Sequence, residues 1–163
     1  ELYFLDTNMK LKSLIIFLII ITSLNSCGYK KMNTESVKLF TLDNLYITGE
    51  KSLNFIIKNK LSLYTNNKSQ SLLDIKINLL KLRKVKEKKS DNQVNKYSIS
   101  LNFSASVIEK NTGEKFNFNK TNISDFVRGS TVINTKKNEE YKLKILAEQI
   151  TEEFVDFLNT NLQ

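Results

Sequence analysis

Positively charged side chains give this sequence its most evident capacity for chemistry. It contains 25 Lys and Arg residues against 17 Asp and Glu residues, a formal net charge of +8 at pH 7. Ammonium and guanidinium groups form charge-assisted hydrogen bonds with phosphates and carboxylates. We therefore expect an anionic partner or surface. The densest run of cations provides the first candidate contacts: Lys81, Arg83, Lys84, Lys86, Lys88 and Lys89.

Catalytic chemistry is not indicated. The chain has no His, the commonest general base and zinc ligand, and only one Cys. Asp74 and Glu109 could form an acid–base pair, but Asp74 lies on the polar side of an alternating segment and Glu109 ends another, so solvated charges are expected. No aromatic platform with interleaved basic residues indicates nucleic-acid binding. We predict no catalytic residue, no metal and no cofactor.

The single cysteine, Cys27, is expected to carry a lipid. It ends the segment Leu24-Asn25-Ser26-Cys27, with an apolar residue three positions before the cysteine and a small residue directly before it. This pattern resembles the bacterial lipobox, whose cysteine thiol is acylated. Because each buried methylene group contributes about 0.8 kcal/mol to membrane binding, several acyl chains would hold the protein firmly at a bilayer.

An apolar run before the cysteine predicts a signal peptide. Residues 14–21 are all apolar and follow the basic segment Met9-Lys10-Leu11-Lys12. The run is shorter than the ~20 residues that a membrane-spanning helix needs. We expect residues 1–26 to be the signal peptide. Two starts stay open, Glu1 and Met9, and with Met9 as the start residues 1–8 are an upstream reading artefact. The lipid-anchored remainder would face the periplasm.

Hydrophobic periodicity predicts strands and helices after the cysteine. Over residues 97–107, apolar residues alternate with Ser and Asn, as in a strand with one buried face. Between residues 53 and 64, apolar residues recur at helical spacing. The first expected elements are a strand over 37–42, a helix from an N-cap at Thr48 to Tyr64, and a strand over 73–79. A flexible basic stretch over 81–89, linked to Asn95, leads to the strand over 97–107. A turn over 111–114, a strand around 116–118 and a helix from about Thr135 follow.

These elements predict an α+β fold with the order βαβββα, in which a four-stranded sheet carries both helices on one face as a two-layer sandwich. Residues 27–163 would form a single domain. The other face of the sheet would be left for solvent or a partner. Its expected residues are small and polar: Ser98, Ser100, Asn102, Ser104, Ser106, Asn117 and Asn119.

Taken together, these features resemble the LPS-assembly lipoprotein family (LptE, formerly RlpB). Gly28 and Tyr29 follow the cysteine, a basic stretch precedes the 97–107 strand, and the last helix carries the segment 147–150, Ala-Glu-Gln-Ile. The resemblance covers residues 27–163. It implies a non-catalytic outer-membrane lipoprotein on the periplasmic side, which plugs the LptD β-barrel, assists barrel assembly and binds lipopolysaccharide during its delivery to the outer leaflet.

The resemblance also implies which residues bind. In this family, basic residues before the third strand and on the fourth strand contact lipopolysaccharide, and the matching candidates are Arg83, Lys84, Lys88, Lys89 and Lys120. The Ser and Asn face would lie against the polar barrel lumen. The alternative is a generic periplasm-facing lipoprotein whose basic face binds anionic membrane or cell-wall polymer. For the sheet face and the lysines, an ordinary solvated surface and a Lys-rich composition also stay open.

Overall fold

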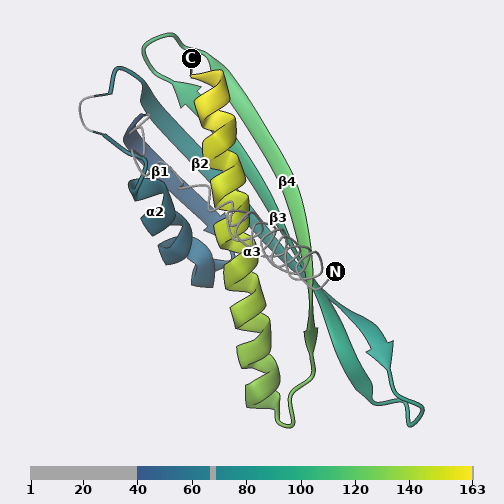
Figure 1. Ribbon diagram of the computed structural model, residues 1–163. Helices are drawn as coiled ribbons and strands as arrows, with labels where there is room; N and C mark the ends of the chain where they lie inside the picture. Colours follow the sequence, from purple (N-terminus) through teal and green to yellow (C-terminus); the bar gives the residue numbers. More distant parts are fainter. Residues whose placement is uncertain (1–39, 67–68, 163) are drawn as a thin grey trace, which may run out of the picture. The chain divides into compact units, whose positions relative to one another are not determined.

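The computed structural model describes residues 40–66 and 69–162 (Figure 1). Cys27, the signal segment over 1–26 and residues 37–39 of the first expected strand lie outside these described residues. In chain order the elements are β1 (Thr41–Gly49), a 3-10 turn η1 (Lys51–Leu53), α2 (Asn54–Ser62), β2 (Leu72–Lys88), β3 (Val94–Glu109), β4 (Lys115–Val127) and α3 (Val132–Asn161).

The four strands form one sheet in the order β1-β2-β3-β4. β1 and β2 are parallel and are joined through α2, because a parallel pair needs a crossover connection. The pairs β2–β3 and β3–β4 are antiparallel. Both helices lie over the same face of the sheet, side by side (Figure 1). The predicted α+β order and two-layer arrangement are confirmed.

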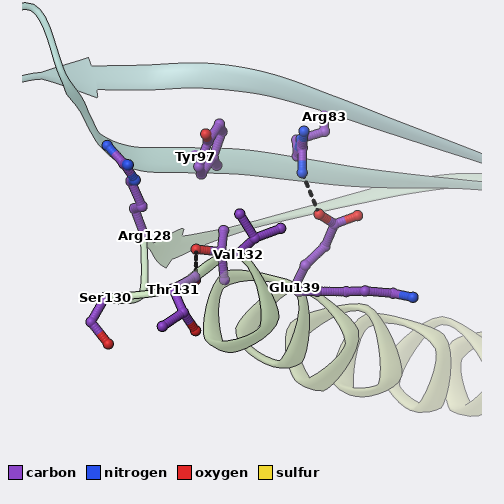
Figure 2. A pocket seen from close by; sticks show the side chains of 9 residues that line it. Arg83, Tyr97, Arg128, Ser130, Thr131, Val132 and Glu139 are labelled. Atoms are coloured by element: carbon purple, nitrogen blue, oxygen red, sulfur yellow. Dashed lines mark hydrogen bonds and ion pairs between the residues drawn. The ribbon is translucent and has the colours of Figure 1, made fainter.

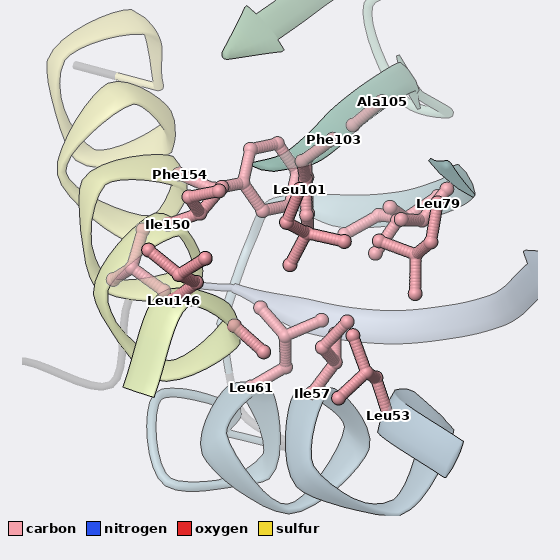
Figure 3. Packing of buried hydrophobic residues seen from close by; sticks show 14 of the residues in the cluster. Leu53, Ile57, Leu61, Leu79, Leu101, Phe103, Ala105, Leu146, Ile150 and Phe154 are labelled. Carbon is pink, nitrogen blue, oxygen red and sulfur yellow. The ribbon is translucent and has the colours of Figure 1, made fainter. Parts of the chain in front are cut away.

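The core lies between the sheet and the two helices. Each inward residue of β3 from Ile99 to Val107 is buried, as its alternating pattern predicts. Phe154 of α3 lies 5.4 Å from Phe103 between ring centroids, and 5.3 Å from Phe118 of β4. Leu53, Ile57 and Leu61 close the core from the α2 side (Figure 3). No helix in the part of the chain that the structure describes has the length and apolarity to cross a membrane.

The basic stretch over 81–89 is not a flexible linker, and this prediction was wrong. β2 continues through it to Lys88, and its backbone pairs with β3 from Lys81 opposite Leu101 to Lys88 opposite Val94. Strand formation here depends on the cross-strand partner more than on intrinsic propensity. A turn between Lys89 and Gln93, with Asn92 at φ 66°, closes the resulting hairpin.

The first strand was predicted to end at residue 42, and both this end and the N-cap at Thr48 were wrong, whereas Thr41 and Leu42 are in the strand as predicted. β1 begins at Thr41 and includes Thr48, which therefore does not cap a helix. A register shift between Leu42 and Asn44 breaks the strict alternation of side chains along β1, so the period of two is hidden in the sequence. Gly49, at φ 93°, ends the strand.

The last helix begins before its predicted start at Thr135. Its N-cap is Thr131, whose side-chain oxygen accepts a hydrogen bond from the backbone N–H of Asn134 at 3.1 Å. The Thr135 hydroxyl donates to the Thr131 carbonyl and accepts from the Gly129 N–H. The first helical turn is capped by a threonine and its apolar residues, Val132 and Ile133, are exposed. Because it buries no apolar side, hydrophobic periodicity does not detect it.

We expect Gly49→Ala to destabilise the fold by more than about 2 kcal/mol, because a Cβ at this position would lie 1.9 Å from the Leu79 carbonyl oxygen and because left-handed φ alone costs ~1–2 kcal/mol. Gly113→Ala is the matched control: its φ is also positive, at 75°, but a Cβ there meets no atom within 4 Å. Urea denaturation measures both variants. Equal losses of unfolding free energy would contradict the clash at Gly49.

Candidate functional site

The predicted small polar residues share the sheet face opposite to α2 and α3. In the β3–β4 register Ser104 lies opposite Asn119, and Ser98, Ser100 and Asn102 alternate with the buried residues of β3. Asn117 and Asn119 alternate in the same way with half-buried Phe116 and Phe118. We call this surface the open face. All seven Ser and Asn residues that the sequence pattern predicted for this face lie on it, including Ser106, which lies opposite Asn117.

Exposed apolar side chains also lie on the open face, which the sequence analysis missed. Leu82 of β2 lies opposite Ser100, and Ser100 lies opposite Ile123 of β4, so the three form one row across the sheet. Leu80 lies opposite Asn102 in the next row. Leu80, Leu82 and Ile123 are 50%, 43% and 66% exposed. We call these three the apolar cluster of the open face.

A hollow of about 390 Å³ lies further along the same face. Tyr46 and Thr48 of β1 line it together with Lys76 and Asn78 of β2, the polar positions of β3, and Asn117 and Asn119 of β4. The hollow therefore crosses all four strands. A large surface that is hollowed and lined by short polar side chains can form many short hydrogen bonds without burying a full charge.

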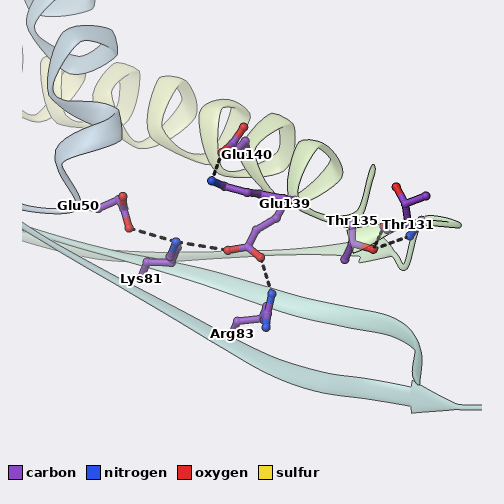
Figure 4. Close-up of polar contacts among 9 residues, drawn as sticks. Glu50, Lys81, Arg83, Thr131, Thr135, Glu139 and Glu140 are labelled. Carbon is purple, nitrogen blue, oxygen red and sulfur yellow. Dashed lines mark hydrogen bonds and ion pairs between the residues drawn. The ribbon is translucent and has the colours of Figure 1, made fainter. Parts of the chain in front are cut away.

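Arg83 points away from the open face, toward α3. Its guanidinium donates a hydrogen bond to a Glu139 carboxylate oxygen at 2.8 Å and lies over the Tyr97 ring at 4.8 Å from the centroid. Lys81 lies 3.3 Å from the other Glu139 oxygen and 3.2 Å from Glu50 (Figure 4). Two of the cations in the basic stretch are therefore neutralised by the protein itself.

Glu50, at one end of this network, keeps its negative charge to a lower pH than an ordinary glutamate. A hydrogen bond from Ser52, together with contacts to Lys81, lowers the pKa of Glu50. Burial lowers the pKa of Lys81, but hydrogen bonds to Glu50 and Glu139 outweigh burial and raise it overall. Glu139 itself is only 9% exposed. The network thus joins η1, β2 and α3 through charged groups at neutral pH.

Lys120 also faces α3. It lies opposite Phe103 in the sheet register, and its ammonium nitrogen lies 2.8 Å from Glu153. This hydrogen bond lowers the pKa of Glu153. Asn122, two residues along β4, donates to the same carboxylate. Lys120 is half-exposed at this helix–sheet seam, on the face opposite to the open one.

Lys84, Lys88 and Lys89 occupy a different environment. Lys84 lies opposite Ser98, on the open face, while Lys88 and Lys89 lie at the end of the β2–β3 hairpin. All three are exposed, and among the described residues none of them has a carboxylate within ion-pair distance. The five predicted basic candidates are therefore not one site: Arg83 and Lys120 are paired on the helix side, and the other three are unpaired.

A pocket of about 620 Å³ lies where the hairpin base meets the beginning of α3 (Figure 2). Its cations are Arg83, Arg128 and Lys136, of which the sequence analysis predicted only Arg83. Thr131, Val132 and Tyr97 also line it. Arg128 follows β4 directly and its guanidinium donates to Gln93 at 3.4 Å. We call this cavity the basic pocket.

The basic pocket combines positive charge with apolar surface. The first turn of α3, whose Asn134 N–H is capped by Thr131, brings the positive end of the helix dipole to the pocket wall. In the same turn Val132 is 86% exposed and Ile133 is 68% exposed. The pocket can therefore accept an anionic group while apolar atoms of the same molecule contact the first turn. No local sequence signal could have identified Arg128 or Lys136, because the topology alone brings them to Arg83.

The two carboxylates that were weighed as an acid–base pair have separate structural roles. Asp74 accepts a hydrogen bond from Asn44 at 2.8 Å. Glu109 is 6% exposed and accepts from the Thr112 backbone N–H at 3.1 Å, so the expectation that it is solvated was wrong. The buried Glu109 carboxylate also accepts a hydrogen bond from the Thr112 hydroxyl, and both bonds stabilise the β3–β4 turn. The described residues contain no group of three or more metal-ligating side chains.

We expect Glu139→Gln to lower the free energy of unfolding by about 1–3 kcal/mol. Glu139 is itself nearly buried, and its substitution removes the negative charge that the partly exposed Arg83 and Lys81 share. Glu140→Gln is the matched control. Glu140 is exposed, and its ion pair with Lys136 has a nitrogen–oxygen distance of 3.7 Å, so its removal should cost less than ~0.5 kcal/mol. Thermal and urea unfolding measure both, and a neutral Glu139→Gln would contradict the network.

The comparisons with known proteins concern the fold. No model of a protein family matches this chain, and no curated protein matches it in sequence. Among solved structures, rare lipoprotein B from Shewanella oneidensis is similar at a TM-score of 0.58 and 15% identity, over 74% of this chain and 95% of that one. A lipoprotein from Caulobacter crescentus is similar at a TM-score of 0.53 and 10% identity, over 78% and 92%. The chain has the fold of these lipoproteins.

Proposed function

We propose that this chain is an outer-membrane lipoprotein, anchored through Cys27 and facing the periplasm, that plugs an LptD-type β-barrel, assists its assembly and binds lipopolysaccharide. In this proposal residues 1–26 are the signal peptide, and residues 27–163 act without catalysing a reaction. The similarity of fold to rare lipoprotein B supports the proposal. The observation that carries it is the open face, which is uncovered, hollowed and partly apolar.

The open face suits a barrel lumen for two reasons. Its short Ser and Asn side chains match the polar walls of large outer-membrane barrels, which plugs often fill. Its apolar cluster would be costly to leave in water, and contiguous exposed apolar side chains usually mark an interaction surface. A plain solvated sheet face accounts for the Ser and Asn residues but gives no reason for Leu80, Leu82 and Ile123.

The basic pocket suits the phosphorylated end of a glycolipid. Arg128, Lys136 and the N-terminus of α3 offer charge and N–H donors to a phosphate, while Val132 offers apolar contact to an acyl chain. Lys88 and Lys89, on the hairpin that forms one wall, extend this positive surface. Arg83 would add a third cation to the phosphate site. Its guanidinium group is already held in place by the ion pair with Glu139 and by its contact with the Tyr97 ring. Lys84, on the open face, and Lys120, beside Glu153, lie outside the basic pocket and remain separate candidates for contact with the glycolipid.

Arg128→Glu should weaken binding of purified lipopolysaccharide at least about tenfold, because it replaces a pocket cation by a charge that repels phosphate. Lys137→Glu is the matched control. It makes a similar charge change next to Lys136 but does not line the pocket, and we expect less than about a threefold effect. Fluorescence titration of the full chain in detergent measures both affinities.

Two further ligands separate this site from general attraction to anions. Lipopolysaccharide stripped of its phosphates should bind weakly to the unaltered protein. Vesicles containing phosphatidylglycerol should bind weakly and lose binding in moderate salt. If those vesicles bind as tightly as lipopolysaccharide, and if Arg128→Glu and Lys137→Glu weaken binding equally, the generic anionic-surface alternative holds instead.

Gentle detergent extraction followed by affinity purification of the chain should recover a large outer-membrane β-barrel. Ile123→Glu should abolish recovery, because it places a charge in the centre of the apolar cluster. Leu63→Glu is the matched control, since Leu63 is similarly exposed, at 60%, but lies at the end of α2 on the helix side. Repeated absence of a barrel, or equal loss with both variants, would reject the plug.

A further inference from the structure

The outer edge of β1 is unusually open for the edge of a sheet. Among the described residues β2 is the only strand that pairs with β1, so the backbone N–H and C=O groups of the opposite edge have no strand partner. Proteins usually protect such edges with Pro, Lys or bulges along their length. β1 contains no Pro, its only charged residue, Asp43, is paired with Lys110, and its register is regular from Asn44 to Gly49.

A groove of about 610 Å³ runs along this edge. Six residues of β1 line one wall, from Leu42 and Asp43 to Thr48, and Asn54, Phe55 and Lys58 of α2 line the other. A free strand edge offers its backbone groups at the spacing that another extended chain needs. The unpaired edge of β1 beside this groove therefore favours an extended peptide over a compact ligand.

Two exposed aromatic residues lie on opposite sides of this edge. Tyr46, which is 58% exposed, lies opposite Lys76 in the register and belongs to the open face. Phe55, which is 73% exposed, belongs to α2 on the helix side. Successive side chains of a strand point to alternate faces, so an added strand would present one set of side chains to Tyr46 and the other to Phe55.

Two cations next to this edge lack partners of their own. Lys58 of α2 lines the groove, and Lys51 of η1 lies outside its lining. Neither has a carboxylate partner among the described residues, and the segment 51–62 contains no acidic residue. The helix wall of the groove therefore favours a partner with acidic residues.

We infer that the outer edge of β1 binds an extended segment of a partner protein, with acidic residues at its ends, as a fifth strand of the sheet. The acidic ends would neutralise Lys51 and Lys58. A second copy of this chain fits less well, because two α2 helices would bring the same unpaired lysines together. The site borders the hollow of the open face, with which it shares Tyr46 and Thr48, but it includes neither the apolar cluster nor the basic pocket and does not rest on the proposed function.

A designed peptide tests the inference without knowledge of the natural partner. The probe is the fluorescently labelled heptapeptide Glu-Val-Thr-Val-Thr-Val-Glu with blocked ends, titrated into the full chain in detergent and followed by anisotropy. We expect saturable binding with a dissociation constant below about 1 mM. Two variants N-methylated on alternate amides should differ: the one methylated on the amides that face β1 should bind at least about tenfold more weakly. A peptide with Lys at both ends should also bind more weakly.

Variants of the protein locate the peptide. Tyr46→Ser and Phe55→Ser should each weaken binding at least about fivefold, whereas Tyr141→Ser, an exposed aromatic of α3 outside the groove, should leave it unchanged. The inference is overturned by any of three results: no saturable binding, equal binding of both N-methylated peptides, or equal effects of all three substitutions. Sedimentation that shows dimers abolished by Tyr46→Ser would assign the edge to a second copy and also overturn it.

Discussion

The packing of α3 along one face of the sheet is the constraint on which the other features depend. Phe154 contacts Phe103 and Phe118 through their rings, and this aromatic contact joins the helix to β3 and β4. Because β3 alternates large apolar residues with Ser and Asn, only one of its faces can be covered without burying unpartnered polar groups. One-sided packing therefore creates both the core and the open face.

The same packing separates two classes of cation. Cations on the helix side meet acidic residues of α3: Arg83 and Lys81 contact Glu139, and Lys120 contacts Glu153. Their charge helps to hold the sheet to the helix. Lys84 on the open face, Lys88 and Lys89 at the hairpin end, and Arg128 before α3 have no carboxylate partner among the described residues, so their charge stays available. A net charge of +8 is thus less informative than its distribution, because the protein itself neutralises part of the basic stretch.

Two kinds of recognition surface result from one small fold. The open face presents short polar groups around an apolar cluster and suits an extended, mixed surface. The basic pocket presents convergent cations beside exposed apolar residues and suits an amphipathic anion. They lie on different sides of the β2–β3 hairpin, so a large partner on the open face leaves the pocket's cations accessible to a second ligand. In the proposed function, this separation would let the chain contact a barrel and a glycolipid at the same time.

The sequence by itself determined the element order, the one-sided character of the sheet and the identity of its polar face. The alternation in β3 and the helical spacing around Phe154 are local patterns, and each arises because the element buries one side only. Such patterns can be recognised without knowing the rest of the fold. Tertiary structure decided the rest. Pairing with β3 turned the basic stretch into strand, a register shift hid β1, and topology brought Arg128 and Lys136 to Arg83. These outcomes depend on residues distant in the chain, because backbone pairing and ion pairing are satisfied by whichever segment lies alongside.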